Sequence, residues 1–198
     1  MDSTLERSIR RAGRSGKLPH SVIFSGSGDL TAAARFYAAA LECTQQDRPC
    51  LRCPACSKVL RGIHPDVITA GNDDGKDLSV EALRALRSDA FIQPNEGACK
   101  VFLFPDCRRL TVQDQNVLLK LVEEGPGYAA FLFCAENPGV LLPTVRSRCV
   151  ELAVRPTGEE NIQLLPQART LLEAMAGGER QDMIRALVGL EYGKITRE

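Results

Sequence analysis

The sequence contains no tryptophan, and aromatic residues of all kinds make up only 5% of its 198 positions. So few aromatic side chains argue against a surface that binds nucleic acid by stacking on its bases. Net charge is also lacking, because 25 basic residues balance 25 acidic ones, so any contact with nucleic acid must come from a local patch.

Long apolar segments are absent as well. No apolar run approaches the roughly 18 residues that a membrane span needs. The N-terminal stretch MDSTLERSIRRAGRSGK has neither the apolar core nor the cleavage site of a secretory signal. We therefore expect a cytoplasmic protein with no membrane partner.

Short apolar runs of strand type alternate with stretches of helical periodicity along most of the chain. The expected strands are 21–25, 66–69, 100–104, 130–134 and 149–154. The expected helices are 4–16, 31–41, 80–90, 111–123 and a short turn at 141–145. Continuous apolar runs such as KVFLF are typical of strands buried on both faces. The alternation therefore predicts an α/β domain with a mostly parallel sheet.

The alternating pattern ends near Val154, and Pro156 and Gly158 are typical of a linker. We therefore expect two parts, a domain over residues 1–155 and a linker with a helical tail over residues 156–198.

Four of the eight cysteines lie close together, namely Cys43, Cys50, Cys53 and Cys56. Four thiolates at this spacing can surround one Zn2+ tetrahedrally, each about 2.3 Å from the metal. All four ligands would come from the protein, so the spacing predicts a closed, structural zinc site. The alternative is a redox or reactive cysteine pair. The other four cysteines are scattered among apolar segments and are expected to be inert: Cys99, Cys107, Cys134 and Cys149.

A glycine turn with the sequence SGSGDLT, residues 25–31, joins the first expected strand to the next helix. In a working phosphate-binding loop, GxxxxGK[ST], backbone amides cradle the phosphate, the lysine neutralises it and the hydroxyl holds Mg2+. Here the loop is short, and Asp29 and Leu30 stand where glycine and lysine are expected. An acidic side chain there would repel phosphate. We therefore expect a degenerate loop that does not bind ATP, at Gly26, Gly28, Asp29 and Thr31.

Two other places are candidates for phosphate chemistry. ATPases that carry such a phosphate-binding loop also end a strand with adjacent acids, which hold Mg2+ and activate water. Here Phe104 is followed only by Pro105 and Asp106, so a surface turn is favoured over a metal site. Arg146 and Arg148 follow a short helical turn. They can form a solvated face, or they can present a guanidinium to a phosphate on a neighbouring subunit.

Taken in order, these elements resemble the clamp-loader ATPase subunits of bacterial DNA polymerase III, which belong to the AAA+ class. The resemblance covers about residues 18–154. It rests on the cysteine cluster and on four motifs: LPHSVIFSG from Leu18, RGIHPDV from Arg61, NVLLKLVEE from Asn116 and LPTVRSRC from Leu142. It implies a P-loop NTPase fold, a three-layer sandwich around a mostly parallel sheet, with a zinc module inserted at about residues 43–56.

Within that group the chain resembles the delta-prime type of subunit. The motor subunits, gamma and tau, keep a loop lysine and an acidic pair that are missing here, and their sensor threonines have no counterpart near Cys134 to Glu136. The resemblance implies a non-catalytic subunit whose Arg148 reaches the adjacent motor subunit's ATP site, acting in trans. The implied partners are the motor subunits, the delta subunit and, through the complex, the sliding clamp and primer-template DNA.

Two alternatives stay open from the sequence. The glycine turn, Thr31 and Asp106 also suit a weakly active ATPase of the gamma/tau type. The cysteine cluster also suits a zinc-containing nucleic-acid-binding module with the basic residues Arg48, Arg52, Lys58 and Arg61. Family members continue into a helical lid and a collar, whereas about 44 residues follow Val154 here. Two interpretations stay open: the lid is reduced, with the tail as a remnant of lid or collar, or the chain is truncated.

Overall fold

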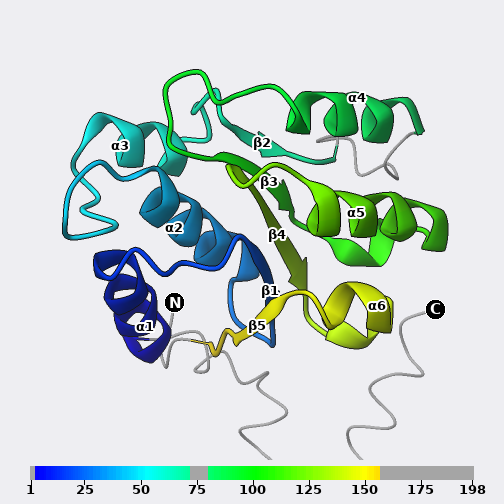
Figure 1. The fold of residues 1–198 in the computed structure, drawn as a ribbon. Coiled ribbons are helices and arrows are strands. Elements are labelled where there is room, and N and C mark those ends of the chain that lie inside the picture. Colours follow the sequence, from blue (N-terminus) through cyan, green and yellow to red (C-terminus); the bar gives the residue numbers. More distant parts are fainter. Residues whose placement is uncertain (1–2, 72–79, 157–198) are drawn as a thin grey trace, which may run out of the picture. The chain divides into compact units, whose positions relative to one another are not determined.

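The computed structural model describes residues 3–71 and 80–156, so the expected linker and tail lie outside the described residues apart from Pro156. The described part is an α/β domain built on a five-stranded sheet (Figure 1). The strand order is β2-β3-β4-β1-β5, and every neighbouring pair is parallel. The strands are β1 (Ser21–Ser25), β2 (Val67–Thr69), β3 (Lys100–Phe104), β4 (Ala129–Ala135) and β5 (Val150–Ala153). The predicted α/β class with a parallel sheet is confirmed.

Helices cover both faces of the sheet and make three layers (Figure 1). One face is covered by α1 (Ser3–Arg14), α2 (Leu30–Glu42) and α3 (Pro54–Leu60). The other is covered by α4 (Val80–Ala90), α5 (Val112–Glu124) and α6 (Pro143–Arg146), with two 3-10 turns, η1 (Cys107–Arg109) and η2 (Pro138–Val140). Among the residues that the structure describes, no helix has both the length and the apolar character needed to cross a membrane.

The register of β3 against β4 is fixed by aromatic side chains on the face beneath α5. Phe102 stacks on Phe131 with ring centroids 5.5 Å apart, and Phe104 stacks on Phe133 at 5.0 Å. Both pairs are direct partners across the two strands. A slip of β3 by one residue would turn Phe102 and Phe104 to the opposite face, away from Phe131 and Phe133, so these pairs hold the centre of the sheet in place.

Helix α5 starts where the sequence predicts. Thr111 accepts the N–H of Asp114, and the Asp114 carboxylate accepts the N–H of Thr111 in return, which is a capping box. Gly125 ends the helix. The segment expected as a helical turn over 141–145 forms α6 slightly later, because Pro143 suits the first position of a helix.

Candidate functional site

In an open parallel sheet, ligands bind outside the carboxyl ends of the strands. The glycine turn follows β1, Asp106 comes two residues after β3, Glu136 follows β4 and Val154 follows β5. All four therefore lie at the same edge of the sheet, which is where a nucleotide would bind.

The glycine turn is closed by hydrogen bonds to the chain's own backbone. Four residues, Gly26 to Asp29, connect β1 to α2. The N–H of Gly26 donates to the carbonyl of Glu136, and the N–H of Gly28 donates to the carbonyl of Val154, each at 3.1 Å. Backbone N–H groups of this turn are the ones that would cradle a phosphate. Here two of them already have partners within the domain.

The two glycines are required by this close approach. Gly26 has a φ of +108°, and a Cβ added there would lie 2.6 Å from the carbonyl oxygen of Val154. A Cβ added at Gly28 would lie 2.7 Å from the carbonyl oxygen of Arg155. Both distances are too short for a side chain, so the packing of the turn against residues 154–155 explains why glycine stands at these positions.

Asp29 occupies the start of α2. Its Oδ1 accepts the N–H of Ala32 at 2.8 Å, so Asp29 is the N-cap of the helix. The positive end of a helix is the place where P-loop proteins hold phosphate. A side-chain carboxylate fills it here, and Thr31 lies half-buried in the first turn.

Asp106 is engaged by two arginines that sequence reasoning missed. Its carboxylate accepts from Nε of Arg108 at 2.9 Å and from Nε of Arg109 at 3.2 Å. The hydrogen bond from the Arg108 side chain is the main cause that holds the pKa of Asp106 below its usual range. Asp106 is also the N-cap of η1, so its carboxylate stabilises this turn. The CRR sequence directly after Asp106 was the available signal for its two arginine partners.

The four clustered cysteines converge as the sequence predicts. Their Sγ atoms all lie within 4.8 Å of one another. Cys43 follows α2, Cys53 is the N-cap of α3 and Cys56 lies in its first turn. Four sulfurs bound tetrahedrally to one Zn2+ are about 3.8 Å apart, so a small contraction of the cluster would fit a metal ion.

Backbone N–H groups point at the sulfurs. Cys43 Sγ accepts the N–H of Cys50 at 3.4 Å, Cys50 Sγ accepts that of Cys53 at 3.3 Å, and Cys53 Sγ accepts that of Cys56 at 3.4 Å. The N–H of Arg52 is the main cause that lowers the pKa of Cys50 to about 6, whereas burial raises the pKa of Cys43 and Cys56. These donors favour the thiolate, which is the metal-binding form.

The remaining cysteines belong to the core. Cys99, Cys107 and Cys134 are buried and Cys149 is half-buried, all as free thiols. Burial raises the pKa of Cys149 to about 11 and that of Cys134 to about 12. Thiols held protonated in this way are unreactive.

The basic residues around the cluster are directed to other partners. Lys58 pairs with Glu96 at 2.6 Å, Arg48 donates to the carbonyl of Gln45 at 3.2 Å, and Arg61 donates to a carbonyl of α3 at 3.4 Å. These three side chains are therefore tied to local structure, while Arg52 is exposed.

The RGIHPDV motif has a structural role. Asp66 is fully buried and accepts the backbone N–H groups of residues 95–97 at 2.6, 2.9 and 2.8 Å. Burial acts to raise the pKa of Asp66, but these N–H groups together hold it below its ordinary value. Glu42, whose pKa burial raises to about 8, accepts the next N–H, from Ala98, at 3.1 Å. The two acids fasten the loop that leads into β3.

Arg148 is exposed and lies between α6 and β5. Its Nε pairs with Glu123 in the last turn of α5, and its Nη1 donates to the carbonyl of Thr144 at 3.0 Å. Sequence reasoning identified Arg148 but missed Glu123, although both lie in the motifs that carry the resemblance. The guanidinium is thus held in one orientation at the surface.

Arg148 and the glycine turn lie at opposite edges of the sheet. Val150, at the start of β5, is paired with Val22 near the start of β1, so Arg148 precedes the amino ends of the strands. The glycine turn follows Ser25 at the carboxyl end. At about 3.3 Å per residue, β1 alone separates the two edges by roughly 13 Å. The fold therefore does not bring Arg148 to its own glycine turn.

A buried glutamine anchors the segment that leads to Arg148. Gln115 on α5 donates to the carbonyls of Leu110 and Val140 at 3.2 and 3.1 Å, and it accepts the N–H of Leu142 at 2.6 Å. Its side chain is almost fully enclosed. Sequence reasoning missed it, and the available signal was a polar residue four positions after the N-cap, one turn before the apolar Leu118.

The parallel five-stranded sheet, covered on both faces and carrying a glycine turn between its β1 strand and α2, defines an α/β domain of the AAA+ clamp-loader type. Residues 1–158 match the family model described as "DNA polymerase III, delta subunit", and the chain belongs to this family.

Curated relatives are DNA polymerase III subunits. The subunit gamma/tau of Mycobacterium tuberculosis is 32% identical over 137 residues, which cover 67% of this chain and 24% of that protein. The subunit tau of Salmonella typhimurium is 29% identical over 186 residues, covering 85% and 29%. The chain thus spans about a quarter of the length of these relatives.

A solved structure shows the same fold. The gamma subunit-related protein of Thermotoga maritima superimposes with a TM-score of 0.55 at 21% sequence identity, covering 80% of this chain and 48% of that one. At this identity the likeness concerns the fold alone.

Proposed function

We propose that the chain is a delta-prime-type subunit of the DNA polymerase III clamp loader, which binds no ATP itself and supplies Arg148 to the ATP site of a neighbouring motor subunit. Family membership supports the clamp-loader context. The observation that carries the proposal is the closed glycine turn, in which Gly26 and Gly28 donate to backbone carbonyls of the same domain. Its partners would be the motor and delta subunits in the cytoplasm and, through the complex, the sliding clamp and primer-template DNA.

Three features act together against nucleotide binding. Two N–H groups of the turn have internal partners, the Asp29 carboxylate caps α2, and Asp106 is paired with two arginines. A phosphate would have to break the hydrogen bonds of the turn and lie beside a carboxylate at the helix end. Both changes cost free energy that a lysine would offset in a working loop, and this turn has none.

The position of Arg148 supports an action in trans. It is exposed, it is oriented by Glu123, and it lies at the edge of the sheet opposite to its own glycine turn. An arginine finger stabilises the charge that develops on a transferred phosphoryl group. If neighbouring subunits pack with the amino edge of one sheet against the carboxyl edge of the next, Arg148 would face the neighbour's γ-phosphate.

The test is Arg148→Ala in a reconstituted clamp loader, with Arg146→Ala as the matched control because it lies in the same segment and is also exposed. Single-turnover hydrolysis at the adjacent motor site should fall by about 1000-fold with Arg148→Ala and stay near the wild-type rate with the control. Assembly is checked by size-exclusion chromatography. Unchanged hydrolysis in a fully assembled complex would reject the finger.

We also propose that Cys43, Cys50, Cys53 and Cys56 hold one structural Zn2+. The convergence of their sulfurs and the N–H donors that favour thiolates support this. The metal would fasten the loop between α2 and α3, with no position open for water. Elemental analysis of the purified chain should find about one equivalent, lost in Cys53→Ser and kept in Cys99→Ser. Less than about half an equivalent in the wild type would count against it.

The domain organisation is part of the proposal. Residues 1–155 would form the AAA+ domain with its zinc module at about 43–56, and residues 156–198 would form a linker and helical tail derived from a lid or collar. The closing of the glycine turn by Val154 supports a boundary directly after β5.

A further inference from the structure

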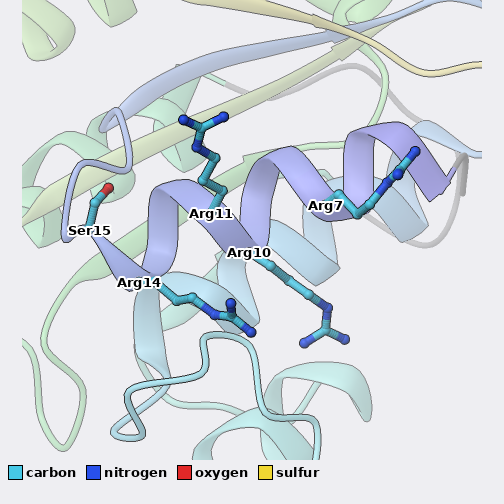
Figure 2. Close-up of a pocket in the computed structure, with 5 residues that line it drawn as sticks. All are labelled: Arg7, Arg10, Arg11, Arg14 and Ser15. Atoms are coloured by element: carbon cyan, nitrogen blue, oxygen red, sulfur yellow. The ribbon is translucent and has the colours of Figure 1, made fainter.

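Helix α1 carries a cluster of arginines on its surface. Arg7, Arg10, Arg11 and Arg14, with Ser15, line a hollow of about 400 Å³ (Figure 2). The chain as a whole has no net charge, so this cluster is a local concentration of positive charge. Glu6 is the only acidic residue of the helix.

Two of the four arginines hold the helix to the loop between α2 and α3, which carries the clustered cysteines. Arg10 Nη1 donates to the carbonyl of Pro49 at 2.5 Å, and Arg14 pairs with Asp47. Figure 2 shows these two side chains leaving the same side of the helix, with Arg11 leaving the opposite side. Arg10 also pairs with Glu6 at 2.9 Å. These contacts explain Arg10 and Arg14 as structural residues.

Arg7 Nε donates to the carbonyl of Ser3 in the same helix at 3.2 Å, but neither Arg7 nor Arg11 is held to another part of the described domain. Both are exposed, and within residues 3–71 and 80–156 neither forms an ion pair. They are four residues apart on one helix face, where like charges repel and destabilise the helix. The helix dipole favours Arg11, which lies in the last turn, but gives no such support to Arg7. No acidic side chain of the described residues pairs with either arginine to offset this repulsion, which points to a ligand of opposite charge.

The geometry points to the phosphodiester backbone of a nucleic-acid duplex as the ligand of α1. Arginine is the side chain best suited to phosphate, because its planar guanidinium donates two parallel hydrogen bonds. Arg7 and Arg11 lie about 6 Å apart along the helix axis, so two guanidinium groups are available for contacts with phosphates. This goes beyond the proposed function, since it needs neither Arg148 nor an assembled complex.

Other polyanions fit this helix less well. The apolar side of α1, with Leu5 and Ile9, is buried in the domain core, so the helix cannot insert an apolar face into an anionic membrane. Between Ser3 and Arg14 there is no aromatic residue, so the helix cannot stack on unpaired bases. Contacts with phosphates alone are sequence-independent and salt-dependent.

The test is fluorescence anisotropy of a labelled mixed-sequence DNA duplex of about 20 base pairs, titrated with the full 198-residue chain at roughly 50 mM salt and above. The variant is Arg7→Glu with Arg11→Glu. The matched control is Arg84→Glu with Arg87→Glu, which makes the same charge change on exposed positions of α4. A third variant, Arg7→Lys with Arg11→Lys, keeps the charge.

We expect the α1 variant to weaken binding at least about tenfold and to reduce the slope of log Kd against log salt by about two, with the α4 control near wild type. The lysine variant should keep most of the affinity. The proposal is overturned if the wild type does not bind the duplex, if the α4 control loses as much as the α1 variant, or if polyglutamate or phosphatidylglycerol vesicles compete as well as unlabelled duplex. Circular dichroism checks that each variant is folded.

Discussion

The glycine turn after β1 and the segment that carries Arg148 lie at opposite edges of one sheet, and they use their polar groups in opposite ways. In the turn, two N–H groups and the Asp29 carboxylate are bound within the domain. In the other segment, buried contacts hold the backbone while the guanidinium stays exposed. The difference shows that the polar groups at one edge of the domain are bound internally, while the other edge leaves a positively charged side chain exposed.

The missing lysine is only one of the differences between this turn and a working phosphate-binding loop. A lysine contributes charge, but the cradle itself is made of backbone N–H groups. Those of Gly26 and Gly28 are directed at Glu136 and Val154. We therefore expect that restoring a lysine alone would leave the cradle closed, so that the proposed lack of nucleotide binding would depend on the backbone as well as on the side chains.

The largest expected effect is at the closed turn. Gly26→Ala should lower the free energy of unfolding by about 3 kcal/mol, because the added Cβ meets the carbonyl of Val154 and the residue must adopt a positive φ. In thermal melts this corresponds to a fall in Tm of roughly 10 °C. The control is Gly127→Ala, where an added Cβ meets nothing within 4 Å. Equal stability of the two variants would mean that the turn is not packed as described.

The next largest effect on stability is expected at Gln115, which anchors the segment that leads to Arg148. Gln115→Ala should lower the free energy of unfolding by about 2–3 kcal/mol, since the carbonyl of Val140 and the N–H of Leu142 lose their buried partner. Urea denaturation measures the loss. Gln113→Ala, on the exposed side of the same helix, should change stability by less than about 0.5 kcal/mol. A similar loss in both would remove the special role of Gln115.

A smaller effect on stability is expected at Asp29, where a substitution distinguishes the effect of the carboxylate charge on ATP binding from that of the closed backbone of the turn. Asp29→Lys should cost about 1 kcal/mol through loss of the N-cap, and it should not create ATP binding, because the turn stays closed. Asp29→Ser keeps a capping oxygen and should be close to neutral, again without ATP binding. Thermal melts and isothermal titration with MgATP test both statements. Tight binding by Asp29→Lys would show that the carboxylate alone excludes the nucleotide.

The smallest effect on stability is expected at the exposed ion pair between Arg148 and Glu123. Glu123→Gln should change the free energy of unfolding by no more than about 1 kcal/mol, because exposed ion pairs contribute little. Glu124→Gln, next to it in the last turn of α5, is the control. A loss of several kcal/mol in urea denaturation with Glu123→Gln would mean that the pair is structural and that Arg148 is not available to a neighbour.

Patterns of apolar residues and turn chemistry made most of the fold predictable. KVFLF is a strand with the predicted bounds, Thr111 and Asp114 form the expected capping box, and the four cysteines converge as their spacing indicates. These features depend on residues close together in the chain, where periodicity and capping rules apply directly.

Long-range partners were not predictable. The carbonyl of Val154 that closes the glycine turn is 126 residues away from Gly28 in sequence, and nothing local at either residue signals the contact. The same holds for Glu123 with Arg148 and for Gln115 with Leu142. Such contacts follow from the order β2-β3-β4-β1-β5, which a single sequence does not specify. The expected tail over 156–198 lies outside the described residues apart from Pro156.

The most direct test of the closed turn is equilibrium titration of the full chain with a fluorescent ATP analogue in the presence of Mg2+. The hydrogen bonds of Gly26 and Gly28 and the Asp29 cap predict no saturable binding below about 1 mM. Mg2+-dependent binding in the micromolar range would contradict it, and would favour the alternative of a weakly active ATPase of the gamma/tau type.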